Sequence, residues 1–137
     1  MILADTGPLI ALIDKGQGDI HVRCVQTYKT LTGSLITTWP CFTEAMYFLS
    51  ELRGWQAQAI LWEFIDRKAL FLHVTSEAEC QRMKVLMEKY RDMPMDLADA
   101  SLVAVAERQK IKRIFTLDSD FYAYRLYDRD AFDVIPI

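Results

Sequence analysis

Residues 95–106 read MDLADASLVAVA, and the rest of the chain is organised around this stretch. Its small and apolar residues predict a helix that packs closely against its neighbours. Two carboxylates, Asp96 and Asp99, stand three positions apart near its start, so they share one face of the helix. Charged side chains are rare among packed alanines, and this helix is therefore a candidate for chemistry.

Apolar segments that end in acids lie on either side of this helix in the sequence. Residues 111–117 (IKRIFTL) predict a strand, and Asp118 and Asp120 follow it. Residues 2–4 (ILA) predict a second buried strand, which ends at Asp5. Both strands therefore carry a carboxylate at the carboxyl end.

Predicted helices alternate with predicted strands along the whole chain. The helices are expected at residues 9–14, 19–31, 40–53, 55–67, 77–91, 95–109 and 119–126. Further strands are expected at residues 35–38, 70–74 and 133–137, and the last is an edge strand because it contains a proline. Alternation of this kind indicates a parallel sheet covered on both faces. We predict an α/β fold, a three-layer α/β/α sandwich with a mainly parallel central sheet of about five strands, in one domain spanning residues 1–137.

The composition argues against a membrane protein, a cysteine-based metal site and binding of nucleic acid through bulk charge. No apolar run approaches the ~20 residues that cross a bilayer, and the first residues lack the features of a signal peptide, so no membrane association is expected. The three cysteines have no metal-ligand spacing and are expected to be buried thiols of a cytoplasmic protein. A net charge of −3 argues against nucleic-acid binding through bulk charge, although acids gathered in one pocket would themselves lower the sum.

Acids from separate parts of the chain are expected to meet at one edge of the sheet. In open α/β sheets, functional sites form beyond the carboxyl ends of the strands. Asp5 and Asp118 stand at such ends, and Glu44 and Asp99 stand early in helices that begin at the same edge. Unpaired carboxylates repel one another unless a cation neutralises them, and oxygen ligands favour Mg²⁺ or Mn²⁺. We therefore predict a divalent-metal site formed by Asp5, Glu44, Asp99 and Asp118.

Each acid also has a structural alternative. Asp5, Asp96 and Asp118 precede predicted helices and have the position of N-caps, and Glu44 complements a helix dipole. Asp99 lies inside its helix with no Lys or Arg four residues on, so a structural role is hardest to assign there. Only the joint placement of these acids favours the metal site.

The acids stand in motifs that resemble those of the PIN domain. These motifs are residues 5–12 (DTGPLIAL), Pro40 with Thr43 and Glu44, residues 99–106 (DASLVAVA) and residues 116–121 (TLDSDF). Their length and order resemble the VapC-like toxins of toxin–antitoxin pairs over essentially the whole chain. One departure is Gly7, where the family often has serine or threonine, but the hydroxyl of Thr6 remains beside it.

The resemblance implies a Mg²⁺- or Mn²⁺-dependent endoribonuclease that cleaves RNA phosphodiester bonds, forms a homodimer and is blocked by a cognate antitoxin. The metal-binding and catalytic acids of the family correspond to Asp5, Glu44, Asp99 and Asp118. Residues with auxiliary roles correspond to Asp96, Asp120 and Thr116.

Other interpretations remain. A PIN-like module that binds RNA or protein without cutting is the alternative, although such modules usually lose some acids and all four are present here. Response-regulator receivers fit poorly, because they need adjacent acids after the first strand. Haloacid-dehalogenase-type phosphatases fit poorly, because they need an acid at position 7, which is Gly here. His21 and His73 stand away from the acids and are interpreted as structural.

Surface contacts are less well specified by the sequence. The candidates for phosphate contacts are Arg91, Arg125 and Arg129, whereas a solvated loop is expected to hold Lys110, Lys112 and Arg113. We consider two roles for Tyr122, Tyr124 and Tyr127, which are stacking on RNA bases and packing within the protein. An antitoxin groove or dimer surface is predicted for residues 40–67, with plain core packing as the alternative for Trp39, Tyr47, Trp55 and Trp62.

Overall fold

The central sheet has five strands in the order β3-β2-β1-β4-β7 in the computed structural model, which describes residues 1–137. The strands are β1 (Ile2–Ala4), β2 (Leu35–Thr38), β3 (Leu70–His73), β4 (Arg113–Phe115) and β7 (Asp133–Val134). Every pairing within this sheet is parallel. The predicted parallel sheet is confirmed, with its last strand at an edge.

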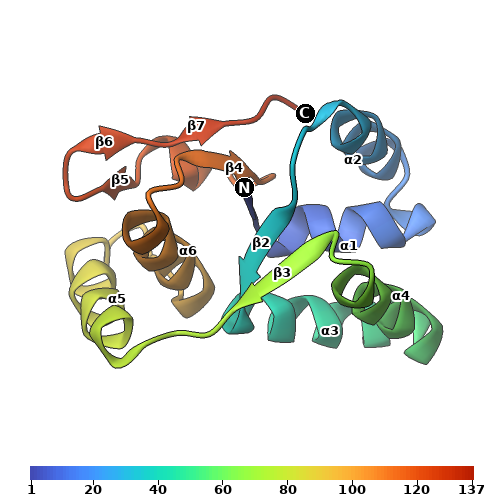
Figure 1. Ribbon diagram of the computed structural model, residues 1–137, viewed down its shortest axis with the longest axis horizontal. Helices are drawn as coiled ribbons and strands as arrows, with labels where there is room; N and C mark the ends of the chain where they lie inside the picture. Colours follow the sequence, from blue (N-terminus) through green and yellow to red (C-terminus); the bar gives the residue numbers. More distant parts are fainter.

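Helices cover both faces of the sheet. They are α1 (Thr6–Ile13), α2 (Asp19–Thr30), α3 (Trp39–Arg53), α4 (Trp55–Asp66), α5 (Glu77–Lys89) and α6 (Leu97–Gln109). Figure 1 shows α5 and α6 on one side of the sheet and α1 to α4 on the other, which confirms the three layers. None of these helices has the length and apolar character that crossing a bilayer requires.

Strand residues alternate between two hydrophobic clusters. Leu3, Ile36 and Ile114 pack with α5 and α6, whereas their neighbours Ile2 and Leu35 pack with α1 to α4. Both faces are therefore buried, as the continuous apolar runs predict. In α6, every residue from 98 to 106 is buried, because small side chains let the helix approach its neighbours closely.

The region after β4 differs from the prediction. A helix over residues 119–126 was expected, but only a 3₁₀ turn η2 (Ser119–Tyr122) forms, followed by the hairpin of β5 (Arg125–Leu126) and β6 (Asp130–Ala131). Arg125 and Leu126 are extended because they pair with Ala131 and Asp130, and Tyr127 and Asp128 form the turn of this hairpin with positive φ angles of 55° and 59°. The Glu107 carboxylate of α6 accepts a hydrogen bond from the Tyr127 backbone N–H, so a tertiary contact holds the turn.

Element boundaries at the sheet edge also differ slightly. Helix α1 begins at Thr6 instead of at residue 9, because the Asp5 carboxylate caps it, and a second 3₁₀ turn, η1 (Lys15–Gln17), follows it. The sheet grows outward from β1 in both directions, to β2 and β3 on one side and to β4 and β7 on the other. The point where the strand order reverses therefore lies between β1 and β4, where α/β folds form their sites.

Candidate metal centre

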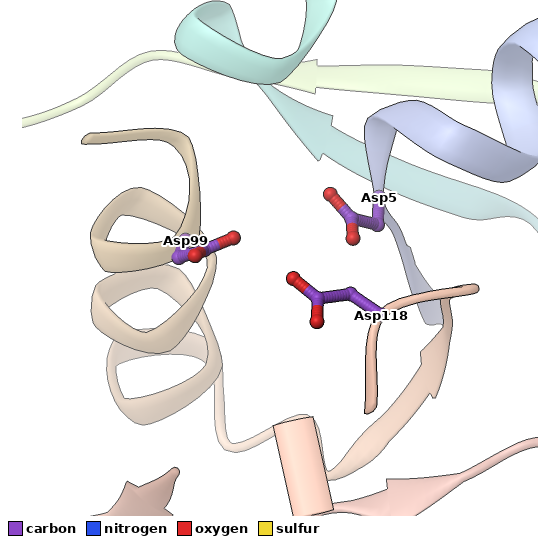
Figure 2. A group of neighbouring side chains, drawn as sticks. All are labelled: Asp5, Asp99 and Asp118. Atoms are coloured by element: carbon purple, nitrogen blue, oxygen red, sulfur yellow. The ribbon is translucent and has the colours of Figure 1, made fainter. Parts of the chain in front are cut away.

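Three carboxylates meet at this reversal point. Asp5 follows β1, Asp118 follows β4, and Asp99 projects from the first turn of α6, so that one oxygen from each lies within 4.8 Å of the others. Figure 2 shows the three side chains pointing into a common space. This space is an open cavity of about 340 Å³, here called the acidic cavity. It is lined by Asp5, Thr6, Gly7, Ile10, Glu44, Phe48, Asp96, Asp99, Leu117 and Asp118.

Two of the three carboxylates also cap helical turns. Oδ1 of Asp5 accepts the Thr6 backbone N–H at 2.8 Å, and Oδ1 of Asp118 accepts the Asp120 backbone N–H at 2.9 Å. An ionised carboxylate has two oxygens and about four acceptor positions. Capping therefore orients each side chain and leaves acceptor capacity for a cation, so the structural and metal-binding interpretations are compatible.

The Thr116 hydroxyl links two of the acids. It donates to Oδ2 of Asp5 at 2.7 Å and accepts from the backbone N–H of Asp118 at 3.0 Å. Thr116 is buried at the end of the sheet, so water does not compete for these bonds. One side chain thus fixes the Asp5 carboxylate and the backbone that carries Asp118.

Tyr124 is the residue that sequence reasoning missed. Its hydroxyl donates a 3.0 Å hydrogen bond to Oδ2 of Asp99. The ring is fully buried and packs edge-on against Phe121 and Tyr90, with centroids 5.0 and 5.1 Å away. No sequence signal indicated this contact, because Tyr124 lies 25 residues from Asp99 in a segment predicted to be helical.

The start of α6 is held by two further contacts. Oδ1 of Asp96 accepts the Asp99 backbone N–H at 2.8 Å, which makes Asp96 the N-cap. The Ser101 hydroxyl donates to the Ala98 carbonyl at 2.7 Å and lies 2.6 Å from the Thr38 hydroxyl, which caps α3. These bonds fasten the first turn of α6 to the neighbouring helix and so hold Asp99 in place.

The other predicted site residues lie outside the group of three carboxylates. Glu44 lines the acidic cavity from α3, but its carboxylate is not in the group of three. Asp120 does not line the cavity and contacts the group through its backbone N–H. The Thr6 hydroxyl, expected to compensate for Gly7, donates to the Cys41 carbonyl at 3.3 Å, and Thr6 lines the acidic cavity, so its compensating role stays a prediction.

Burial, and after it the neighbouring acids, destabilise the charged forms of two carboxylates in the cavity. Burial raises the pKa of Asp5 to about 6, although hydrogen bonds from Thr116 and Thr6 oppose the shift. Burial, followed by the charge of Asp96, raises the pKa of Asp99 to about 7. No Lys, Arg or His lines the acidic cavity. A set of carboxylate oxygens without a compensating base fits a hard divalent cation such as Mg²⁺ or Mn²⁺.

The histidines lie elsewhere. His73 contacts the Glu79 carboxylate at 2.8 Å, and His21 contacts the Ala11 carbonyl at 2.6 Å. Both contacts support the structural interpretation of these residues.

A second cavity of about 790 Å³, here called the apolar groove, opens beside the acidic cavity. Its lining includes Trp39, Pro40, Tyr47 and Leu97, and it shares Glu44, Phe48 and Asp96 with the acidic cavity. Trp39 and Tyr47 are 44% and 61% exposed, so plain core packing does not account for them. Trp62 packs against Phe42 with ring centroids 5.0 Å apart, and the exposed Trp55 does not line the groove.

Comparisons with known proteins agree with this architecture. The family model described as PIN domain matches residues 2–126. Ribonuclease VapC26 of Mycobacterium tuberculosis is 26% identical over 136 residues, covering 98% of this chain and all of the relative. The crystal structure of M. tuberculosis VapC20, described as a sarcin-ricin loop cleaving toxin, superposes with a TM-score of 0.83 at 16% sequence identity. The superposition covers 94% of this chain and 98% of the VapC20 chain. A toxin–antitoxin complex from Klebsiella pneumoniae has a TM-score of 0.68 at 17% identity, covering 90% of this chain and 91% of its counterpart.

Proposed function

The chain belongs to the PIN domain family, and on this premise we propose that it is a divalent-metal-dependent endoribonuclease and the toxin of a toxin–antitoxin pair. The observation that carries the proposal is the convergence of three carboxylates without a compensating base. The match to a relative named as a ribonuclease, along the full length of that relative, supports RNA as the substrate.

The residues that would hold the metal are Asp5, Asp99 and Asp118. Glu44 is proposed as the fourth acid, and the auxiliary roles are assigned to Asp96, Asp120 and Thr116. When bound, a Mg²⁺ or Mn²⁺ ion supplies positive charge that activates water and neutralises charge developing on the phosphate.

The side chains of the protein then orient the reactants. Thr116 and Tyr124 each occupy one carboxylate oxygen, at Oδ2 of Asp5 and Oδ2 of Asp99, and thereby limit the rotation of both side chains. We assign to Glu44 the role of accepting a proton from the attacking water, because its carboxylate lines the cavity but stands outside the group of three. The open mouth of the cavity admits a phosphodiester chain.

The antitoxin is proposed to occupy the apolar groove. An inhibitor seated there would cover Glu44 and Asp96, which the groove shares with the acidic cavity, and would bury Trp39 and Tyr47. Aromatic side chains of this kind dominate the energy of protein interfaces. We further propose that the protein is a cytoplasmic homodimer.

The experiment is cleavage of single-stranded RNA by the purified protein with Mg²⁺ or Mn²⁺, with and without EDTA. We expect Asp5→Asn and Asp99→Asn to lower kcat at least about 100-fold, since each removes a charged ligand. Asp66→Asn changes an exposed acid of α4 and serves as the matched control. A wild-type protein that binds RNA but cleaves none with either metal would favour the non-catalytic module instead.

A further inference from the structure

A second groove leaves the acidic cavity in another direction. It has a volume of about 310 Å³ and shares Leu117 and Asp118 with the acidic cavity. Its remaining wall includes Ser119 and Tyr122 of η2, and Arg23 of α2. We call it the η2 groove.

The three tyrosines that the sequence does not distinguish have different environments in the structure, and only one of them lines this groove. Tyr124 is fully buried, and its hydroxyl is bonded to Asp99. Tyr127 is held by Glu107, whose carbonyl accepts its hydroxyl hydrogen bond and whose carboxylate accepts its N–H. Tyr122 is 63% exposed, and its hydroxyl makes no hydrogen bond within the protein; only its backbone carbonyl accepts one, from Arg125. Its ring is therefore free to stack with a ligand in the groove.

The same groove supplies a positive charge that the sequence did not single out. The three arginines considered from the sequence, Arg91, Arg125 and Arg129, do not line this groove. Arg23 lines the groove and is half exposed. Its guanidinium donates to the Ile137 carbonyl and lies 3.7 Å from Asp19, a solvent-exposed pair of little strength.

An RNA chain whose phosphate lies at the acids must leave the acidic cavity along its surface. The apolar groove is lined by no basic residue, whereas the η2 groove carries Arg23. A polyanion is expected to follow the groove that has the cation. Unpaired bases stack on exposed aromatic rings while arginines contact phosphates, which is the usual arrangement for single-stranded nucleic acid.

We propose that the η2 groove binds the single-stranded RNA next to the cleaved bond, with a base stacked on Tyr122 and a phosphate paired with Arg23. The proposal rests on the proposed ribonuclease function and adds the subsite that holds the substrate beside the reacting phosphate. Stacking accounts for tolerance of base identity, because every base has a flat face.

The experiment measures kcat and KM with a pool of short single-stranded oligoribonucleotides of random sequence. We expect Tyr122→Ala to raise KM about tenfold with kcat within about twofold, because it removes binding that is equal in the ground and transition states. Tyr122→Phe keeps the ring and is expected to retain the wild-type KM. Trp55→Ala removes an aromatic side chain that is 67% exposed and lines neither groove, and it is the matched control.

The charge is tested separately by salt dependence. Arg23→Gln is expected to raise KM and to reduce the slope of log KM against log salt by about 0.7, the value for one phosphate contact on a single strand. Lys112→Gln removes a similarly exposed cation, 3.6 Å from Asp130 and outside the groove, and should leave the slope unchanged.

The outcomes separate the two proposals. Cleavage by the wild type with an unchanged KM for Tyr122→Ala would overturn the groove assignment and leave the ribonuclease function standing. Loss of antitoxin inhibition in Tyr122→Ala with an unchanged KM would also overturn it, by giving the groove to a protein partner. Absence of cleavage by the wild type would overturn the proposed function and this subsite with it.

Discussion

The Tyr124 hydroxyl donates a 3.0 Å hydrogen bond to Oδ2 of Asp99, which joins the buried aromatic cluster behind η2 to the acidic cavity. The bond occupies one of the two carboxylate oxygens of Asp99 and leaves the other available to a cation. Tyr124 therefore acts on Asp99 as a positioning residue, although it does not line the cavity.

Tyr124→Phe should weaken metal binding while the ring remains packed. We expect the Kd for Mn²⁺, measured by titration calorimetry, to rise about tenfold, since one hydrogen bond to a charged group contributes about 1.5–3 kcal/mol. Tyr90→Phe is the matched control, because its hydroxyl accepts from the Arg125 backbone N–H and touches no carboxylate. Equal Mn²⁺ affinity in both variants would show that the Tyr124 hydroxyl does not orient Asp99.

Thr116→Val should affect both stability and metal affinity. Valine keeps the shape but leaves Oδ2 of Asp5 and the Asp118 N–H without their partner, at a cost of about 1–3 kcal/mol in the free energy of unfolding. Thr37→Val, which removes an equally buried hydroxyl bonded to the Ala4 carbonyl, is the control. We expect chemical denaturation to report losses in both variants, but a raised Kd for Mn²⁺ only in Thr116→Val.

The metal-free protein should lose stability as the pH rises from about 4 to about 7. The folded chain holds protons on Asp5 and Asp99 up to pKa values of about 6 and about 7, against 3.8 without burial. The contribution of these two protonated carboxyl groups to the free energy of unfolding is complete below pH 4, and it is lost as the pH rises through 6 and 7.

Thermal unfolding should reveal this as a fall in Tm of roughly 5 °C, which Mn²⁺ reverses at the higher pH. Asp5→Asn cannot titrate and should reduce the fall. A Tm that is flat over this range, or a fall of equal size in Asp5→Asn, would contradict the raised pKa values.

Tyr47→Ala should release the protein from its antitoxin. Tyr47 is 61% exposed in the apolar groove and does not line the acidic cavity, so cleavage of RNA should persist while inhibition weakens about tenfold or more. Trp55→Ala, on α4 outside the groove, should remain fully inhibited. Inhibition of Tyr47→Ala at the wild-type antitoxin concentration would place the antitoxin elsewhere.

Much of the fold follows from local patterns in the sequence. The apolar runs at residues 2–4 and 35–38 become β1 and β2 because each is flanked by turn or capping residues and is buried on both faces. The small residues of α6 predict its burial for the same reason. The helix expected over residues 119–126 does not form, because Arg125 and Leu126 pair with β6 and Glu107 holds the turn at Tyr127, so tertiary contacts override local propensity.

The acids at the strand ends could also be placed from the sequence, because parallel strands bring their carboxyl ends to one edge. The sequence thus placed Asp5, Asp99 and Asp118 together, whereas Thr116 was proposed as auxiliary only because of the resemblance to the PIN domain. Their service as metal ligands stays a prediction, as does the role of Glu44.

The tertiary structure alone decided which oxygens are occupied, which tyrosine is buried and which arginine faces the site. Asp5 and Thr116 are 111 residues apart, and Arg23 reaches the η2 groove from a helix with no motif of its own. A sequence specifies which residues are apolar, capping or charged, since these are local properties. Contacts between distant side chains depend instead on how helices pack on the sheet, and that packing places Tyr124 behind Asp99 and Tyr122 beside Asp118.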